Sequence, residues 1–142
     1  MATRSTISVI DNDGTIKQVY CHWDGYLSYN GRLLKQEYNS LKLANELVSF
    51  GDMSILAENI NPTHPDHSFD SAQEGVCVYY GRDRGESNTD PKVFKDLNEF
   101  LDKRMDEEYN YLFKDGQWLV SYYKNPHDFV PFDYKEEEEK NH

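Results

Sequence analysis

The chain has 142 residues, with 26 Asp and Glu against 15 Lys and Arg, which gives a formal net charge of −11. This charge argues against general nucleic-acid binding, because neutralising phosphates requires a basic patch or stripe, and the sequence contains none. Its apolar runs are shorter than the roughly 18 residues of a membrane helix, and residues 1–10 lack the apolar core of a signal peptide. We therefore expect a cytoplasmic protein that contacts no membrane.

Residues 3–10 and 16–24 are rich in β-branched and aromatic side chains, and the turn-forming residues 11–14 separate them, so they predict a β-hairpin. A two-residue turn at 12–13 or at 13–14 would sort the side chains in the same way, whereas a three-residue turn would break this sorting. The set expected on one face is Thr3, Ser5, Ile7, Val9, Ile16, Gln18, Tyr20, His22 and Asp24.

Residues 32–50 carry apolar side chains at helical spacing and predict a helix. Ser40 is a suitable N-cap that would divide this helix, and Gly51 is a suitable residue just past its end. Residues 53–60 predict one more short helix, residues 61–75 a long surface loop and residues 76–80 an apolar strand.

Residues 81–88 predict a polar loop, and Asp90 followed by Pro91 predicts the start of a helix that continues through Leu101. Residues 109–113 and 118–123 flank an Asp-Gly pair and predict a second hairpin whose aromatic face covers the helices. The order ββ-α-β-α-ββ predicts one α+β domain over residues 1–132, with a mostly antiparallel sheet and helices on one face. We expect the acidic residues 133–142 to form a mobile tail.

The first candidate site lies at the end of the first hairpin, where Tyr20, His22 and Asp24 alternate on one strand face beside Trp23. Polar side chains are costly to bury without partners, so this face is expected to be wet or to line a pocket. One interpretation is a ligand site in which His22 and Asp24 form an acid and base pair. The other is an open sheet face with ordinary hydrogen bonds.

The second candidate site places Arg82 and Arg84 in a loop flanked by glycines. Guanidinium groups near loop amides and a helix N-terminus suit a phosphate or a carboxylate. The alternative is that both arginines form surface ion pairs, because acidic residues alternate with them.

Metal and cofactor chemistry have little support in the sequence. His64 and His67 lie near Asp66 and Asp70, but no helix aligns the two rings, so we expect an exposed loop without metal and a protein without a cofactor. The chain has no phosphate-binding loop, nucleophile elbow, Cys-x-x-Cys or His-Glu-x-x-His motif. Its two cysteines lie in apolar runs typical of reduced, buried thiols.

Four segments taken together resemble small accessory proteins encoded by large tailed bacteriophages. They are MATRSTI, YCHWDGY, HSFD and YGRDRGE, at residues 1–7, 20–26, 67–70 and 80–86. The resemblance covers residues 1–123 and implies no catalytic residue. It implies a protein that acts in the cytoplasm of the bacterial host, against host defence or host metabolism.

Three functional hypotheses follow. The one we favour is a binding protein without enzymatic activity that captures a phosphate-bearing small molecule or a host protein, and it leaves open a homo-oligomer. The second is a small hydrolase or transferase that acts on a nucleotide through His22 and Asp24. The third is an acidic mimic of DNA that inhibits a host DNA-processing protein. The ligand-binding residues expected under the first hypothesis are Arg82, Arg84, His22, Trp23, Asp24 and Tyr20.

Overall fold

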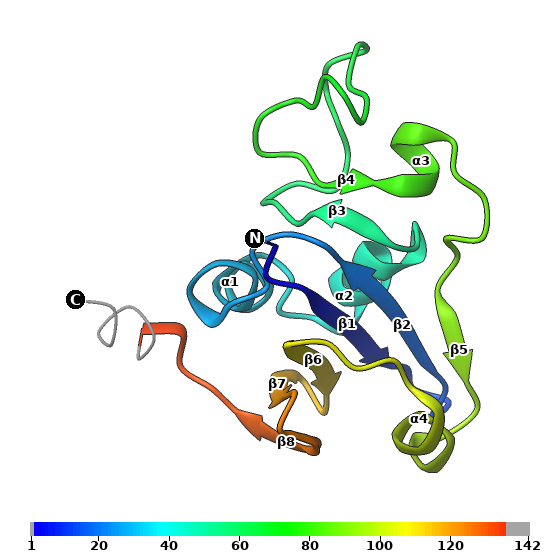
Figure 1. Ribbon diagram of the computed structural model, residues 1–142, viewed down its shortest axis with the longest axis vertical. Coiled ribbons are helices and arrows are strands. Elements are labelled where there is room, and N and C mark those ends of the chain that lie inside the picture. Colours follow the sequence, from blue (N-terminus) through cyan, green and yellow to red (C-terminus); the bar gives the residue numbers. More distant parts are fainter. Residues whose placement is uncertain (1, 136–142) are drawn as a thin grey trace.

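The structure is a computed structural model that describes residues 2–135, and it shows one α+β domain built on a mixed sheet (Figure 1). The sheet runs in the order β4-β3-β2-β1-β6-β7-β8, and β5 also pairs with β2. The predicted α+β class is confirmed, but β1 pairs with β6, and β2 with β3, in parallel. The strands are β1 Ser5–Ile10, β2 Ile16–Cys21, β3 Met53–Ile55, β4 Val78–Tyr79, β5 Lys92–Phe94, β6 Tyr109–Lys114, β7 Gln117–Tyr122 and β8 Asn125–Pro131.

Short helices connect and cover these strands. A π-helical turn spans Leu27–Gly31, and the α-helices are α1 Arg32–Glu37, α2 Leu41–Ser49, α3 Tyr80–Arg84 and α4 Leu97–Lys103. None of the helices in the described part of the chain is long and apolar enough to cross a lipid bilayer. The prediction of a mobile acidic tail concerns residues 133–142, most of which lie outside the described residues.

The first hairpin forms as predicted, but its register differs from the expected one. The Asp11 N–H donates to the Thr15 carbonyl at 2.8 Å, which leaves a three-residue turn, and Ile7 pairs with Val19. The two-residue turn was therefore the wrong assumption, and the expected face set is divided between the two faces. Tyr20 pairs with Thr6 and lies on the face opposite to the core residue Ile7.

Helices cover both faces of the sheet, not one as predicted. Helix α2 lies behind the sheet in Figure 1 and α1 lies to its left, and both contribute to the main core, to which Leu47 and Trp118 belong. The Trp118 Nε1–H donates to the Tyr38 carbonyl at 3.0 Å, which fixes the C-terminal hairpin beneath α1. Helix α4 lies on the opposite face, where Phe100 belongs to a separate small cluster with Leu112.

Three short segments differ from the sequence expectations. Residues 53–55 and 92–94 are strands where helices were expected, because each pairs with an edge of β2. Residues 80–84 form α3 where the end of a strand and the start of a loop were expected, and the strand predicted over 76–80 covers only 78–79. Helix α4 begins at an Asp96 N-cap, whose side chain accepts from the Glu99 N–H, and not at Asp90. Long-range pairing thus overrides local helical periodicity at these positions.

Two local predictions are confirmed. The predicted helix over residues 32–50 is divided by Ser40, whose side chain accepts from the Leu43 N–H. The C-terminal hairpin turns through Asp115 at φ 51° and Gly116 at φ 81°, and its aromatic face covers the helices.

Gly51 should be far more sensitive to substitution than Gly116, although both have a positive φ, of 87° and 81°. A Cβ on Gly51 would lie 2.0 Å from the Thr89 carbonyl oxygen, whereas a Cβ on Gly116 would meet nothing within 4 Å. We expect Gly116→Ala to cost about 1 kcal/mol of unfolding free energy and Gly51→Ala about 3 kcal/mol or more. Urea unfolding of the two variants would check this, and equal losses would contradict the packing argument.

Candidate functional site

The end of β2 presents a hydrogen-bonded pair of titratable rings. The Tyr20 hydroxyl lies 2.6 Å from His22 Nδ1, and the His22 ring meets Trp23 edge-on with a centroid separation of 4.8 Å. Burial raises the pKa of the Tyr20 phenol above its ordinary value of 10.0, although Arg4 opposes the shift. The Tyr20 backbone is held by its N–H, which donates to Asp52 Oδ1 at 2.9 Å. This pair therefore has a fixed position on the sheet.

Asp24 does not form the predicted acid and base pair with His22. Its carboxylate accepts from the Tyr26 hydroxyl at 3.4 Å, and its charge acts on Tyr29, whose pKa is raised first by burial and then by Asp24. Asp24 has φ 57°, a left-handed conformation in which the chain turns out of β2 into the π-helical turn. The structure therefore separates the two groups that the alternation of a strand would have brought together.

Glu107, just before β6, is a carboxylate close enough to His22 for the two charges to interact. Burial raises its pKa, and Arg4 and His22 both oppose that shift. The parallel pairing of β1 with β6 brings this part of the chain beside the first hairpin. Local sequence patterns carry no signal for such long-range pairing, so Arg4 and Glu107 were missed as members of this site.

Arg82 is a structural residue, and its guanidinium is already occupied. Its Nε and Nη2 donate to the Asp83 carboxylate at 2.9 and 3.1 Å, Nη1 donates to the Ile60 carbonyl at 2.7 Å, and Nη2 also donates to the Cys77 carbonyl at 2.9 Å. The rings of Tyr79 and Phe50 also contact the guanidinium, with centroids 4.7 and 5.3 Å from its central carbon. The predicted anion-binding role of Arg82 is therefore replaced by the ion-pair alternative.

Arg84 remains available at the surface. Its side chain is 53% exposed, lies 3.9 Å from the Glu86 carboxylate and stacks over the Phe69 ring at 4.6 Å. The two arginines that the sequence places together thus separate into one structural and one exposed group.

The histidines of the loop are also occupied. His67 Nδ1 accepts from the Gln73 N–H at 2.9 Å, and its Nε2 faces the Asp83 carboxylate at 3.4 Å with the side chain 2% exposed. His64 Nδ1 accepts from the Asp66 N–H at 3.1 Å. No group of three His, Cys, Asp or Glu within residues 2–135 is arranged to hold a metal ion. The metal interpretation of this loop therefore has no geometric support.

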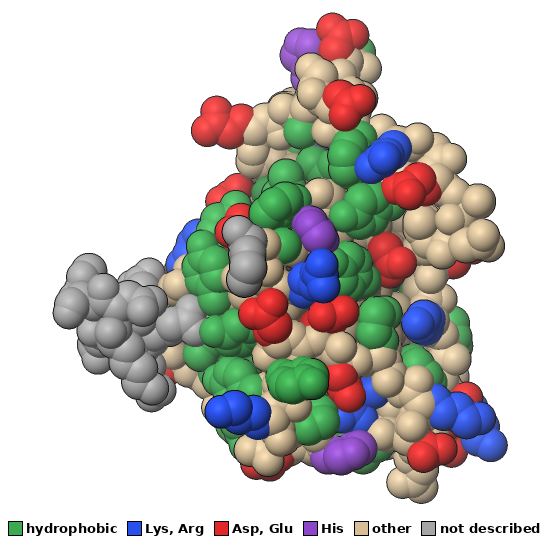
Figure 2. All heavy atoms as spheres, in the orientation of Figure 1, with side chains coloured by type: hydrophobic (Ala, Val, Ile, Leu, Met, Phe, Trp, Pro, Cys, Tyr) green, Lys and Arg blue, Asp and Glu red, His purple; other side chains and the backbone are tan. Residues whose placement is uncertain are grey.

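Two groups of aromatic rings lie near each other, one beside Arg4 and the other beneath Arg84. We call Tyr20, His22, Trp23, Phe69 and Tyr80 the aromatic strip. Tyr80 and Phe69 have ring centroids 5.5 Å apart, and Tyr80 is near enough to Tyr20 to influence its pKa. Figure 2 shows hydrophobic side chains gathered over β3 and β4, with a histidine beside a basic side chain near the centre of this face. Trp23 is 42% exposed.

None of the five hollows of about 230 to 440 Å³ described on the surface of residues 2–135 is lined by the aromatic strip. Hollows of about 410 and 390 Å³ lie on other parts of the described surface, one beside β4 and one between the first turn and α2. No side chain of the aromatic strip lines either hollow. The strip is therefore suited to contact a broad surface and less suited to enclose a small molecule.

Removal of the Arg82 guanidinium should lower the free energy of unfolding, whereas removal of the Arg84 guanidinium should leave it nearly unchanged. Arg82→Met removes the guanidinium donors of the buried Asp83 carboxylate and of the Ile60 and Cys77 carbonyls, so we expect a loss of about 3 kcal/mol. Arg84→Met is the matched control and should change the stability by less than about 0.5 kcal/mol. Urea unfolding at pH 7 measures both, and a fully stable Arg82→Met would contradict the structural role.

The same cluster predicts a loss of stability in acid. Burial would raise the pKa of Asp83, but hydrogen bonds from Arg82 and the Tyr79 N–H outweigh it and hold the pKa below its ordinary 3.8. The folded state then binds fewer protons at this group, so its contribution is present above pH 3.8 and is lost as the pH falls through the lowered pKa. Unfolding free energies of wild type and Asp83→Asn should therefore differ most near neutral pH and converge in acid. A constant difference would contradict the linkage.

Comparisons with known proteins assign this chain to no family. No protein-family model, curated protein or solved structure matches the chain. The resemblance to accessory proteins of tailed bacteriophages therefore stays an expectation from the sequence. Any functional conclusion must come from the geometry of the aromatic strip and its surroundings.

Proposed function

We propose that this protein is a non-enzymatic accessory protein of a tailed bacteriophage and that it binds a protein of the bacterial host through the aromatic strip. The phage setting comes from the resemblance of residues 1–123. The observation that carries the binding proposal is the exposed Trp23, which meets His22 edge-on in a strip where Arg4 is near Tyr20 and Arg84 lies over Phe69. Tryptophan, tyrosine and arginine are the residues that most often supply the binding energy of protein interfaces.

A protein partner fits this face better than a phosphate-bearing small molecule. Small-molecule sites are usually concave, with a few polar groups that converge on the ligand. Here the Arg82 guanidinium already donates to Asp83 and to two backbone carbonyls, and Arg84 lies over the Phe69 ring of the strip. The exposed Trp23 and the four half-buried rings beside it offer an apolar surface, with Arg4 and Arg84 near its edges.

Binding is also favoured over turnover and over mimicry of DNA. The acid and base pair proposed for an enzyme needs Asp24 beside His22, and Asp24 instead accepts from Tyr26. A mimic of DNA needs carboxylates in a regular row, about one charge per 1.7 Å. On the face shown in Figure 2, acidic side chains are scattered and alternate with basic ones.

The test is quantitative capture from a lysate of a bacterial host by immobilised wild type, Trp23→Ala and Tyr123→Ala, followed by affinity measurement with the purified captured protein. Tyr123 is the matched control because it is an exposed aromatic outside the strip, 73% accessible. We expect Trp23→Ala to weaken binding by about 2 kcal/mol, roughly thirtyfold, and Tyr123→Ala to bind like wild type.

Two results would count against this proposal. If Tyr123→Ala loses as much affinity as Trp23→Ala, the aromatic strip is not the contact surface. If nucleotides raise the melting temperature of wild type but not of Arg84→Ala, the small-molecule alternative is correct. All three variants replace exposed side chains, so a change in binding should not come from unfolding of the variant.

A further inference from the structure

A second surface of the molecule is an acidic groove of about 410 Å³ beside the edge strand β4. Its apolar floor includes Ala57, Val76 and Val78, all at least nine-tenths buried. Glu58 and Glu74 stand on its rim, and Tyr29 forms part of its wall. No residue of the aromatic strip lines this acidic groove, so the two surfaces are separate.

The walls of the acidic groove are held by backbone pairing and do not depend on a ligand. The Asn59 N–H and side-chain Nδ2 both donate to the Gly75 carbonyl at 3.1 Å, and the Cys77 N–H donates to the Asn59 carbonyl at 2.8 Å. Arg82 binds the Ile60 and Cys77 carbonyls and so joins the same two segments a second time. The hollow is therefore preformed, which lowers the entropic cost of filling it.

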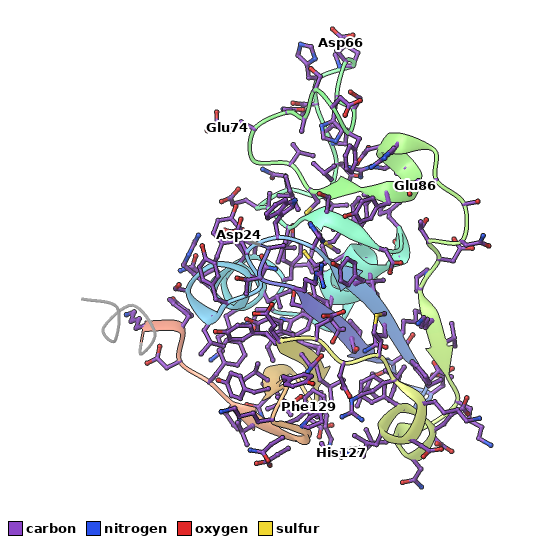
Figure 3. The ribbon with its side chains drawn as sticks, viewed as in Figure 1. Asp24, Asp66, Glu74, Glu86, His127 and Phe129 are labelled. Carbon is purple, nitrogen blue, oxygen red and sulfur yellow. The ribbon has the colours of Figure 1, made fainter. Side chains whose placement is uncertain are left out.

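The charges around the acidic groove are one-sided. Both Glu58 and Glu74 are exposed, and the ion pairs among residues 2–135 include neither. Burial is the largest cause that raises the pKa of Tyr29, and the charges of Asp24 and Glu58 raise it further, while Arg32 opposes them. In Figure 3, Asp24 and Glu74 lie on the same side of the molecule, and Glu74 projects outward.

Arg32, the basic group in this neighbourhood, does not neutralise the rim. Its Nε donates to the Ser28 carbonyl at 3.2 Å, and its Nη1 donates to Gln36 Oε1 at 3.0 Å. An occupant with positive charge would therefore meet carboxylates and a tyrosine ring, while its apolar portion would cover the floor. The C-terminal residues of this chain are excluded by charge, because residues 136–139 are four consecutive glutamates.

We propose that the acidic groove binds an extended segment of a partner protein in which lysine or arginine alternates with apolar side chains. Alternate side chains of an extended segment point to the same side, so the apolar residues face the floor. The long basic side chains between them start on the outer side and bend back to Glu58 and Glu74 on the rim. Tyr29 supplies an aromatic face for a basic head group.

The experiment titrates ¹⁵N-labelled protein with the peptide acetyl-Leu-Lys-Leu-Lys-Leu-amide and follows the amide signals by NMR. We expect shifts at Ala57, Gly75 and Val76, and a dissociation constant about tenfold higher for the double variant Glu58→Gln, Glu74→Gln. The double variant Glu37→Gln, Glu99→Gln removes the same net charge elsewhere and should bind like wild type. Ala72→Trp should also abolish binding, because it fills the acidic groove without changing the charge.

Each other outcome would overturn the proposal. Equal losses in the two double variants would mean attraction by net charge alone. Equal binding of acetyl-Leu-Glu-Leu-Glu-Leu-amide would mean an apolar contact without charge recognition. Shifts at the aromatic strip in place of the acidic groove would place the peptide on the surface of the proposed function. Ala72 is exposed, so Ala72→Trp is expected to fold and keeps the test valid.

Discussion

The double pairing of strand β1 is the constraint on which the rest of the structure depends. This strand pairs antiparallel with β2 and parallel with β6, and its residues Ser5 to Val9 are buried. A buried strand must satisfy its backbone N–H and carbonyl groups on both edges, so this position requires two partners from distant parts of the chain. The parallel partner brings Glu107 toward Arg4 and His22. The surroundings of the Tyr20 and His22 pair are thus a consequence of backbone hydrogen bonding.

A second constraint acts above the sheet, where Arg82 joins segments that would otherwise be independent. Its bonds to Asp83, Ile60 and Cys77 connect α3 to both ends of the long loop. Buried His67 faces the same carboxylate and fixes the middle of that loop. Because these bonds occupy the Arg82 guanidinium, Arg82 is not available to bind a ligand. The same bonds hold the walls of the acidic groove in place.

The two proposed surfaces differ in the sign of the charge that they offer. Arg4 and Arg84 lie beside the aromatic strip on a chain with a net charge of −11, whereas the acidic groove carries Glu58 and Glu74, which form no ion pair among the described residues. The net negative charge of the chain therefore describes the acidic groove but not the aromatic strip. A partner of one kind is discouraged from the other surface by like-charge repulsion, which is how charge contributes to specificity.

The sequence by itself determined those features that depend on neighbouring residues. Ser40 as a cap, the Asp115 and Gly116 turn and the aromatic face of the C-terminal hairpin all follow from local chemistry, as does the α+β class. The tertiary structure alone decided the parallel pairing, the strands at residues 53–55 and 92–94 and helix coverage of both faces. It also decided that Arg82 is structural and that Asp24 turns away from His22. The physical reason is that these features depend on hydrogen bonds and burial between distant segments, which outweigh local propensity at the places where the two conflict.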